Sequence, residues 1–68
     1  MKLTKIKSSS IEAIGYEPKP RQMQALFKNN SLYQYDNVSQ EEYNSILNSH
    51  SAGSKLKEVV KGKDYEKL

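Results

Sequence analysis

The sequence predicts an α+β fold, in which a three-stranded antiparallel β-meander is followed by two helices packed on one face of the sheet (βββαα). The first half contains three short segments with β-branched, aromatic or alternating apolar residues, and the short connections between them indicate antiparallel pairing. The second half contains two segments with apolar residues at helical spacing. A chain of 68 residues forms one small domain, so both helices are expected to pack on the same sheet.

The three predicted strands are separated by residues that interrupt regular structure. The strands cover 11–16, 22–28 and 31–38. Pro18 and Pro20 end the first strand, because proline fixes φ and lacks an amide hydrogen. Asn29 and Asn30 separate the second and third strands, and asparagine tolerates the left-handed conformation that tight turns need. The second and third strands are therefore predicted to form a hairpin.

The length of the hairpin loop decides which face of the sheet carries Tyr33 and Tyr35, because side chains alternate along a strand. A two-residue loop at 29–30 places both tyrosines on an open face, where they would form a stacking platform. The residues that share this face are then Gln22, Gln24 and Leu26.

A three-residue loop at 28–30, closed by a left-handed Asn30, gives the opposite result. It pairs Leu26 with Leu32 and moves the two tyrosines to the core face, which also carries Met23, Ala25 and Phe27. We favour this register because it separates apolar from polar side chains more completely. The tyrosine hydroxyls could still reach the rim of the core, since tyrosine has an apolar body and a polar tip.

The two predicted helices have recognisable beginnings. Ser39 and Glu42 have the spacing of a capping box, followed by an apolar stripe at Tyr43, Ile46, Leu47 and His50. We interpret His50 as a partly buried packing residue. The chain then turns at 51–54, and the second helix presents Leu56, Val59 and Val60, with Gly62 as a candidate C-cap.

Composition narrows the classes of function. There are no cysteines and a single histidine, so no metal site, disulfide or cofactor is expected. The chain shows no apolar segment long enough to span a membrane and no signal peptide, so we expect a cytoplasmic location and no membrane partner. No set of acid, base and nucleophile can be assembled around His50, so we expect no enzymatic activity and infer no small-molecule substrate.

Candidate binding residues lie where positive charge gathers. The net charge is +3, with lysines at both ends of the chain and acidic residues in the middle. Lys57 and Lys61 are four residues apart and would share one helix face with Lys55 nearby, where they could contact phosphates or simply be solvated. The turn containing Ser51 and Gly53 could bind an anion or cap the helix. The basic N-terminal segment carries Lys2, Lys5 and Lys7.

Five short blocks of the sequence, taken together, resemble the KTSC domain, a small module found at the C-terminus of some lysyl-tRNA synthetases and as free-standing bacterial and phage proteins. The matching residues are Ser8, Ser9, Ile11, Ile14, Gly15 and Tyr16, then Met23, Ala25 and Phe27, then Tyr33, Tyr35 and Val38, then Tyr43 and Leu47, and finally Ser51 and Gly53. The chain departs from the family pattern at Asn30, where glycine is usual, and at Ser39, where proline is usual. Lys55 and Leu56 replace a usually aromatic pair, which weakens a stacking role at that position.

The resemblance implies a basic N-terminal arm at 1–7, a single domain at 8–65 and a short C-terminal tail at 66–68. It also implies RNA binding, by analogy with the synthetase fusion. Our hypothesis is a non-enzymatic RNA-binding module whose contacts come from Tyr33, Tyr35, Lys55, Lys57, Lys61, Ser51 and Gly53. The alternative is a protein-interaction module, such as a phage-encoded modifier of a host protein, that uses either the glutamine-rich face around Leu26 and Leu32 or an unpaired strand edge.

Overall fold

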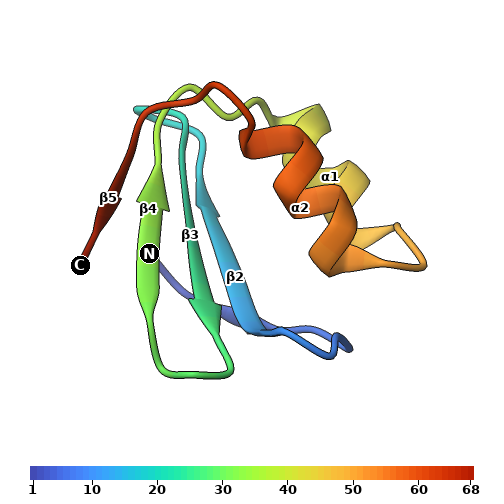
Figure 1. Cartoon of the computed structure of the whole chain (residues 1–68). Coiled ribbons are helices and arrows are strands. Elements are labelled where there is room, and N and C mark those ends of the chain that lie inside the picture. The colour runs from blue at the N-terminus through green and yellow to red at the C-terminus, as the bar shows by residue number, and fades with distance from the viewer.

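The computed structural model describes all residues, 1–68, and shows five strands and two helices (Figure 1). The strands are β1 (Thr4–Lys5), β2 (Ile11–Glu17), β3 (Gln22–Phe27), β4 (Leu32–Tyr35) and β5 (Tyr65–Lys67), and the helices are α1 (Gln40–Leu47) and α2 (Ala52–Val60). All neighbouring strands are antiparallel, in the order β1-β2-β3-β4-β5. The α+β class, the antiparallel sheet and the two helices are therefore as predicted.

The sheet has five strands rather than the predicted three. β1 lies inside the segment that we expected to be a basic arm, and β5 extends into the segment expected to be a tail. The chain passes from β4 through both helices and returns as β5 to pair with β4, so Tyr35 lies opposite Tyr65 and Tyr33 opposite Lys67. The prediction missed both strands because they are short and their residues are exposed, which leaves no alternating apolar pattern.

The hairpin between β3 and β4 has the three-residue loop that we favoured. Leu26 pairs with Leu32, the Phe27 amide donates to the Ser31 carbonyl at 2.9 Å, and Asn30 is left-handed with φ of 70°. The register places Tyr33 and Tyr35 on the face that contacts the helices. The alternative register, with both tyrosines on the opposite face, is wrong.

The core lies between this face of the sheet and the two helices. Its largest fully buried side chains are Ile11, Ile14, Met23, Val38, Ile46 and Leu56. α1 packs over β2, where the rings of Tyr16 and Tyr43 stack with centroids 5.1 Å apart. In Figure 1 both helices lie toward the β2 side of the sheet, and β4 and β5 extend beyond them. This uneven cover leaves part of the core face open.

α1 begins as predicted and ends earlier. Ser39 Oγ accepts from the Glu42 amide at 3.1 Å, and Glu42 Oε1 accepts from the Ser39 amide at 2.9 Å, which completes the capping box. The helix ends at Leu47, which is 43% exposed, and His50 is an exposed loop residue. Our interpretation of His50 as a packing residue is therefore wrong, because the chain leaves the helix before reaching that position.

α2 begins one residue after Ser51, so Gly53 lies in its first turn rather than in a preceding loop. The Ser51 hydroxyl makes no capping hydrogen bond. The helix ends at Val60, and Gly62 follows with φ of 82°, in the left-handed conformation expected just beyond a helix. Lys61 therefore lies beyond the last helical residue.

Candidate nucleic-acid interface

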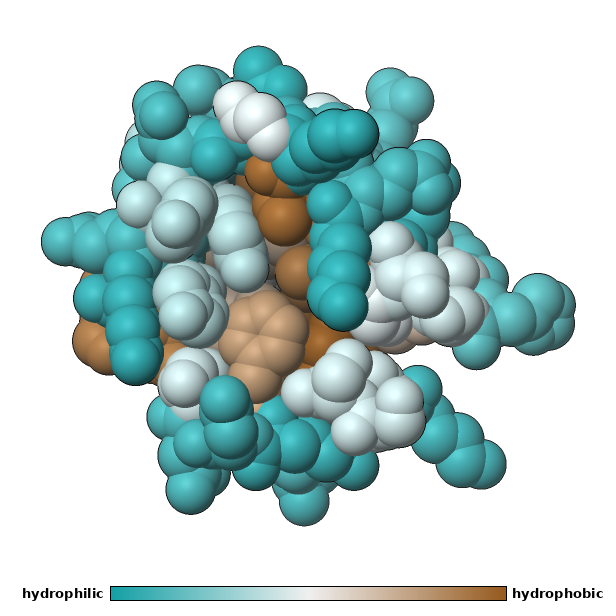
Figure 2. Space-filling model, in the orientation of Figure 1, coloured by the Kyte–Doolittle hydropathy of each residue, from teal (hydrophilic) through white to brown (hydrophobic).

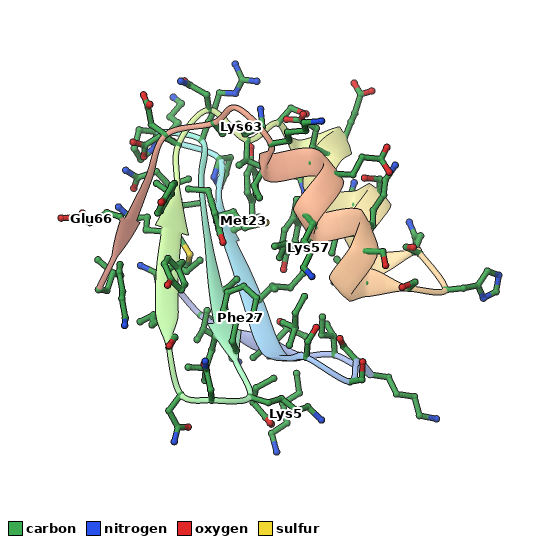
Figure 3. The ribbon with its side chains drawn as sticks, in the orientation of Figure 1. Lys5, Met23, Phe27, Lys57, Lys63 and Glu66 are labelled. Carbon is green, nitrogen blue, oxygen red and sulfur yellow. The ribbon has the colours of Figure 1, made fainter.

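The open part of the core face forms an aromatic groove between α2 and the outer strands of the sheet. Its volume is about 420 Å³, and its lining residues are Phe27, Tyr33, Tyr35, Leu56, Lys57, Val60, Gly62, Lys63 and Tyr65. Figure 2 shows the groove as hydrophobic surface in a hollow near the centre of this view, bordered by polar residues. In the same orientation, Figure 3 shows Phe27 on the sheet side and Lys57 on the helix side.

The aromatic rings of the groove contact one another across three strands. Tyr33 lies at the centre of this cluster, with its ring centroid 5.6 Å from Phe27, 6.4 Å from Tyr35 and 6.0 Å from Tyr65. The neighbours differ in exposure, since Tyr35 is 7% exposed and Tyr65 is 67% exposed. The cluster therefore runs from a buried ring to one whose surface is largely open to solvent.

Burial affects the chemistry of the inner tyrosine. Desolvation raises the pKa of Tyr35 above its ordinary value, and the nearby phenols of Tyr33 and Tyr65 raise it further. The Tyr35 hydroxyl thus remains a neutral hydrogen-bonding group at neutral pH.

Two lysines on the groove wall differ in their pairing. Lys63 Nζ lies 3.2 Å from Glu42 Oε1 and donates to the Asn37 carbonyl at 2.8 Å, so its ammonium group is already paired within the domain. The ion pairs of the chain involve Lys5, Lys55 and Lys63, which leaves Lys57 free. Lys67 lies opposite Tyr33 in the sheet and therefore projects from the groove side of β5.

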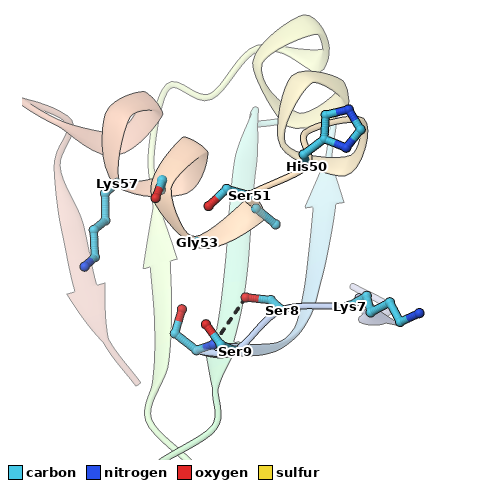
Figure 4. Close-up of a pocket in the computed structure, with 10 residues that line it drawn as sticks. Lys7, Ser8, Ser9, His50, Ser51, Gly53 and Lys57 are labelled. Carbon is cyan, nitrogen blue, oxygen red and sulfur yellow. Dashed lines mark hydrogen bonds between the residues drawn. The ribbon is translucent and has the colours of Figure 1, made fainter.

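A second, polar depression lies at the start of α2, and we call it the serine hollow (Figure 4). Its volume is about 620 Å³, and it is lined by Lys7, Ser8, Ser9, Ser10, His50, Ser51, Ala52, Gly53, Ser54 and Lys57. The Ser8 hydroxyl accepts from the amides of Ser10 and Ile11, each at 3.2 Å, and so fixes one wall of the hollow. The lining contains no carboxylate.

The predicted site residues are distributed between these two depressions. Tyr33 and Tyr35 line the aromatic groove, Ser51 and Gly53 line the serine hollow, and Lys57 lines both. Lys55 lines neither and lies 3.4 Å from Glu58, while Lys61 lines neither and follows the end of α2. Of the three predicted lysines, only Lys57 therefore lines a depression.

The N-terminal lysines also separate. Lys7 lines the serine hollow, whereas Lys5 Nζ lies 3.7 Å from Glu12 Oε2. Lys2 belongs to the segment that lies against Gly15, because its carbonyl oxygen would be 2.6 Å from a Cβ at that glycine. These three lysines consequently do not form one patch.

The sequence reasoning missed Tyr65 and Lys63 as groove residues. No alternating apolar pattern marks the residues after Gly62, so there was no sequence signal for either residue. No group of three or more His, Asp or Glu side chains is placed to hold a metal ion. No helix is both long and apolar enough to cross a membrane.

Comparison with known proteins identifies the family. The sequence profile of the KTSC domain matches residues 7–65. The chain belongs to the KTSC domain family. The fold is similar to the crystal structure of a KTSC domain protein from Yersinia pestis, with a TM-score of 0.92, 28% sequence identity, and coverage of 98% of this chain and 96% of that one. An uncharacterized protein from Stutzerimonas stutzeri (strain A1501) is 31% identical over 65 residues, which cover 96% of this chain and 92% of the relative.

The residues that match the KTSC pattern can now be placed in the structure of this chain. The two serines at the start of the domain line the serine hollow, and Gly53 lies close to the Ser8 and Ser10 hydroxyls. The tyrosine pair of the third block lies on the core face and lines the aromatic groove. Most of the residues that carried the resemblance therefore lie in the core or around the two depressions.

Proposed function

We propose that this KTSC domain is a non-enzymatic module that binds RNA through unpaired bases placed in the aromatic groove. The observation that carries the proposal is the cluster of Phe27, Tyr33, Tyr35 and Tyr65, which is open to solvent at Tyr65 and has lysines on its wall. Aromatic platforms beside positive charge are typical of proteins that bind single strands.

The openness of the ring cluster favours an unpaired strand over a duplex. Bases in a helical stem are stacked on each other, so their faces are not available to a tyrosine ring. An unpaired base can stack on the exposed Tyr65 and extend toward Tyr33, whose centroid lies 6.0 Å away. The groove volume of about 420 Å³ suits a small number of bases rather than a double helix.

Positive charge beside the groove supports binding of the strand's backbone. Lys57 is exposed and has no ion-pair partner, so its ammonium group can contact a phosphate without breaking an existing interaction. Lys67 projects from the same side of the sheet as Tyr33. The phosphates would therefore follow the two rims, and the bases would lie between them.

The test is fluorescence anisotropy with single-stranded RNA, a stable RNA hairpin stem, single-stranded DNA and duplex DNA, at two salt concentrations. We expect the single strands to bind more tightly than the duplexes, with affinity that falls as salt increases. Replacing Tyr65 with alanine should weaken single-strand binding at least about five-fold, since a stacked base contributes about 1–3 kcal/mol.

A matched pair of lysine variants distinguishes a specific phosphate contact at the groove from a general effect of positive charge on binding. Lys57→Ala should weaken binding and reduce the salt slope by about 0.7, the value for one phosphate contact on a single strand. Lys55→Ala removes the same charge from the same helix but lies outside both depressions, so it should match the wild type. Equal losses in the two variants would contradict the proposed groove, and tighter binding of duplex DNA would identify a different nucleic-acid ligand.

A second candidate function is protein recognition by the opposite face of the sheet. Leu26 and Leu32 are paired there, and the Leu68 amide donates to the Leu32 carbonyl at 2.8 Å, which brings a 54% exposed leucine beside them. The rest of the face is polar, with a Gln24–Gln34 hydrogen bond at 3.0 Å. A defined protein partner that survives nuclease treatment and is lost with Leu26→Asp would support this candidate, and a partner retained by that variant would exclude this face.

A further inference from the structure

The serine hollow and the aromatic groove are parts of one continuous surface. Lys57 lines both depressions. A third depression, of about 420 Å³, shares Ser10 with the serine hollow and Phe27 and Tyr33 with the aromatic groove. A flexible chain can therefore pass from the tyrosines to the serines without leaving concave surface.

The two ends of this surface differ in chemistry. The groove is lined mainly by aromatic and aliphatic side chains. The serine hollow is lined by five serines, two lysines and His50, and has one hydrophobic residue and no carboxylate. Hydroxyl donors and ammonium groups around a space free of negative charge are suited to a phosphate and poorly suited to a base.

The backbone is arranged so that the serines from two distant segments meet. A Cβ at Gly53 would lie 2.7 Å from Ser10 Oγ and 3.7 Å from Ser8 Oγ, so the glycine allows the 8–10 segment to approach the first turn of α2 closely. Ser51 makes no capping bond, which leaves its hydroxyl available. Figure 4 shows Ser8, Ser9 and Ser51 on the facing walls of this hollow, with Lys57 at one side.

We propose that the serine hollow is the phosphate subsite of the same binding surface, and holds a backbone phosphate of the strand whose base stacks in the aromatic groove. This inference rests on the proposed function and specifies its ligand as a nucleotide chain with a base and a phosphate engaged at separate places. Lys57 lies between the two places and contacts the connecting part of the strand. The nucleoside without its phosphate binds the groove alone.

The deciding variant is Ser54→Asp, with Ser54→Asn as its matched control. Ser54 is exposed in the first turn of α2, lines the serine hollow and does not line the aromatic groove. That turn contains no acidic residue, so aspartate there complements the helix dipole and does not threaten folding. It places negative charge where the proposal places a phosphate, whereas asparagine has nearly the same shape and no charge.

The measurements use the full chain with three probes: inorganic phosphate, uridine, and a single-stranded hexamer of uridylate. In amide NMR spectra we expect inorganic phosphate to shift Ser10 and Gly53, and uridine to shift Tyr33 and Tyr65. Ser54→Asp should weaken hexamer binding about five-fold, as expected for repulsion between unit charges at close range in water, and leave the uridine response unchanged. Ser54→Asn, which adds no charge, should bind the hexamer more tightly than Ser54→Asp and give the wild-type uridine response.

Three results would overturn the inference, and they are distinguishable. If the wild type binds the hexamer and both Ser54 variants bind it equally well, the phosphate subsite is wrong and the groove proposal stands. If the wild type binds no hexamer at low salt, the proposed function fails and the phosphate subsite fails with it. A uridine response that is lost in Ser54→Asp would also contradict separate places for base and phosphate.

Discussion

Another segment approaches closely at both Gly15 and Gly53, but the neighbouring atoms differ. At Gly15 a Cβ would lie 2.6 Å from the Lys2 carbonyl oxygen and 2.9 Å from Leu3 Cδ2, so the obstacle includes backbone. At Gly53 the nearest atom is the Ser10 hydroxyl, which can rotate away. The same substitution should therefore have different effects at the two positions.

We expect Gly15→Ala to destabilise the protein by about 1–2 kcal/mol, because β1 must move away from β2. Gly53→Ala should be nearly neutral, since about 1 kcal/mol of gained helix propensity offsets the displaced hydroxyl. Urea unfolding followed by circular dichroism measures both, and amide exchange at Thr4 and Lys5 reports the loss of β1. Equal stability of Gly15→Ala and wild type would show that the N-terminal segment adapts without cost.

At some positions the residue type alone predicts the backbone conformation, and at others it does not. Asn30 was predicted to be left-handed and has φ of 70°, as asparagine in a hairpin loop commonly does. Arg21 has φ of 67°, which nothing in its side chain predicts. Its conformation depends on tertiary contacts instead, since the Val38 amide donates to its carbonyl at 3.0 Å.

Among the elements, α1 is shorter than the apolar pattern of its sequence predicted. Tyr43 and Ile46 are buried as predicted, whereas Leu47 is 43% exposed and His50 lies outside the helix. Asn48 ends the helix with φ of −94° and ψ of 0°, and polar residues there compete with helical hydrogen bonds. A helix of eight residues offers only a narrow stripe to the sheet.

This difference predicts unequal effects for neighbouring positions on α1. Ile46 is 0% exposed, so Ile46→Ala should cost about 2–5 kcal/mol, which is comparable to the whole stability of so small a domain. Leu47→Ala should cost less than about 1 kcal/mol, because its side chain is partly solvated already. Thermal unfolding of the two variants tests the comparison, and similar melting temperatures would contradict the assigned end of the helix.

The edge strands β1 and β5 could not be predicted from their own residues. They contain two and three residues, all exposed, and their conformation comes from pairing with β2 and β4. β2, β3 and β4 could be predicted, because β3 alternates between buried and half-buried residues and the other two are rich in isoleucine or tyrosine. Missing β5 also meant missing Tyr65, and with it the open end of the aromatic groove.

On the scale of the whole molecule, Lys63 connects the helices to the last strand. It lies between α2 and β5, pairs with Glu42 in the first turn of α1, and donates to the Asn37 carbonyl just before that helix. The amide of Ser39 and then the ammonium of Lys63 lower the pKa of Glu42 below its ordinary value of 4.5. The ionised carboxylate is therefore stabilised in the folded state.

The Glu42 carboxylate makes the stability of the protein depend on pH in a direction that can be predicted. Because the folded pKa of Glu42 is lower than the unfolded one, its contribution is fully present above pH 4.5 and is lost as the pH falls through the folded pKa. Glu42→Gln keeps an oxygen acceptor for the Ser39 amide but cannot titrate. We expect stability to fall more steeply in wild type than in Glu42→Gln below pH 4.5. Parallel stability curves from urea unfolding would contradict this role.

Only part of the candidate site could be anticipated from the sequence. Five of the residues that the sequence singled out line one of the two depressions: Tyr33, Tyr35, Lys57, Ser51 and Gly53. The sequence left the tyrosines as either core or open platform, whereas in the structure they lie on the core face and also line a groove, because the helices cover one side of the sheet and leave the β4 and β5 side open. How far two helices extend over a sheet depends on their packing, which residue patterns alone do not specify.

The placement of β1 and β5 at opposite edges of the sheet has a practical consequence for labelling and fusion. A polypeptide attached after Leu68 would emerge next to the strand that carries Tyr65, and would compete with any ligand for the mouth of the groove. One attached before Met1 would leave from the segment that lies against Gly15, on the face of the sheet opposite the groove. If the groove binds a ligand as proposed, reporter dyes and purification tags therefore belong at the N-terminus.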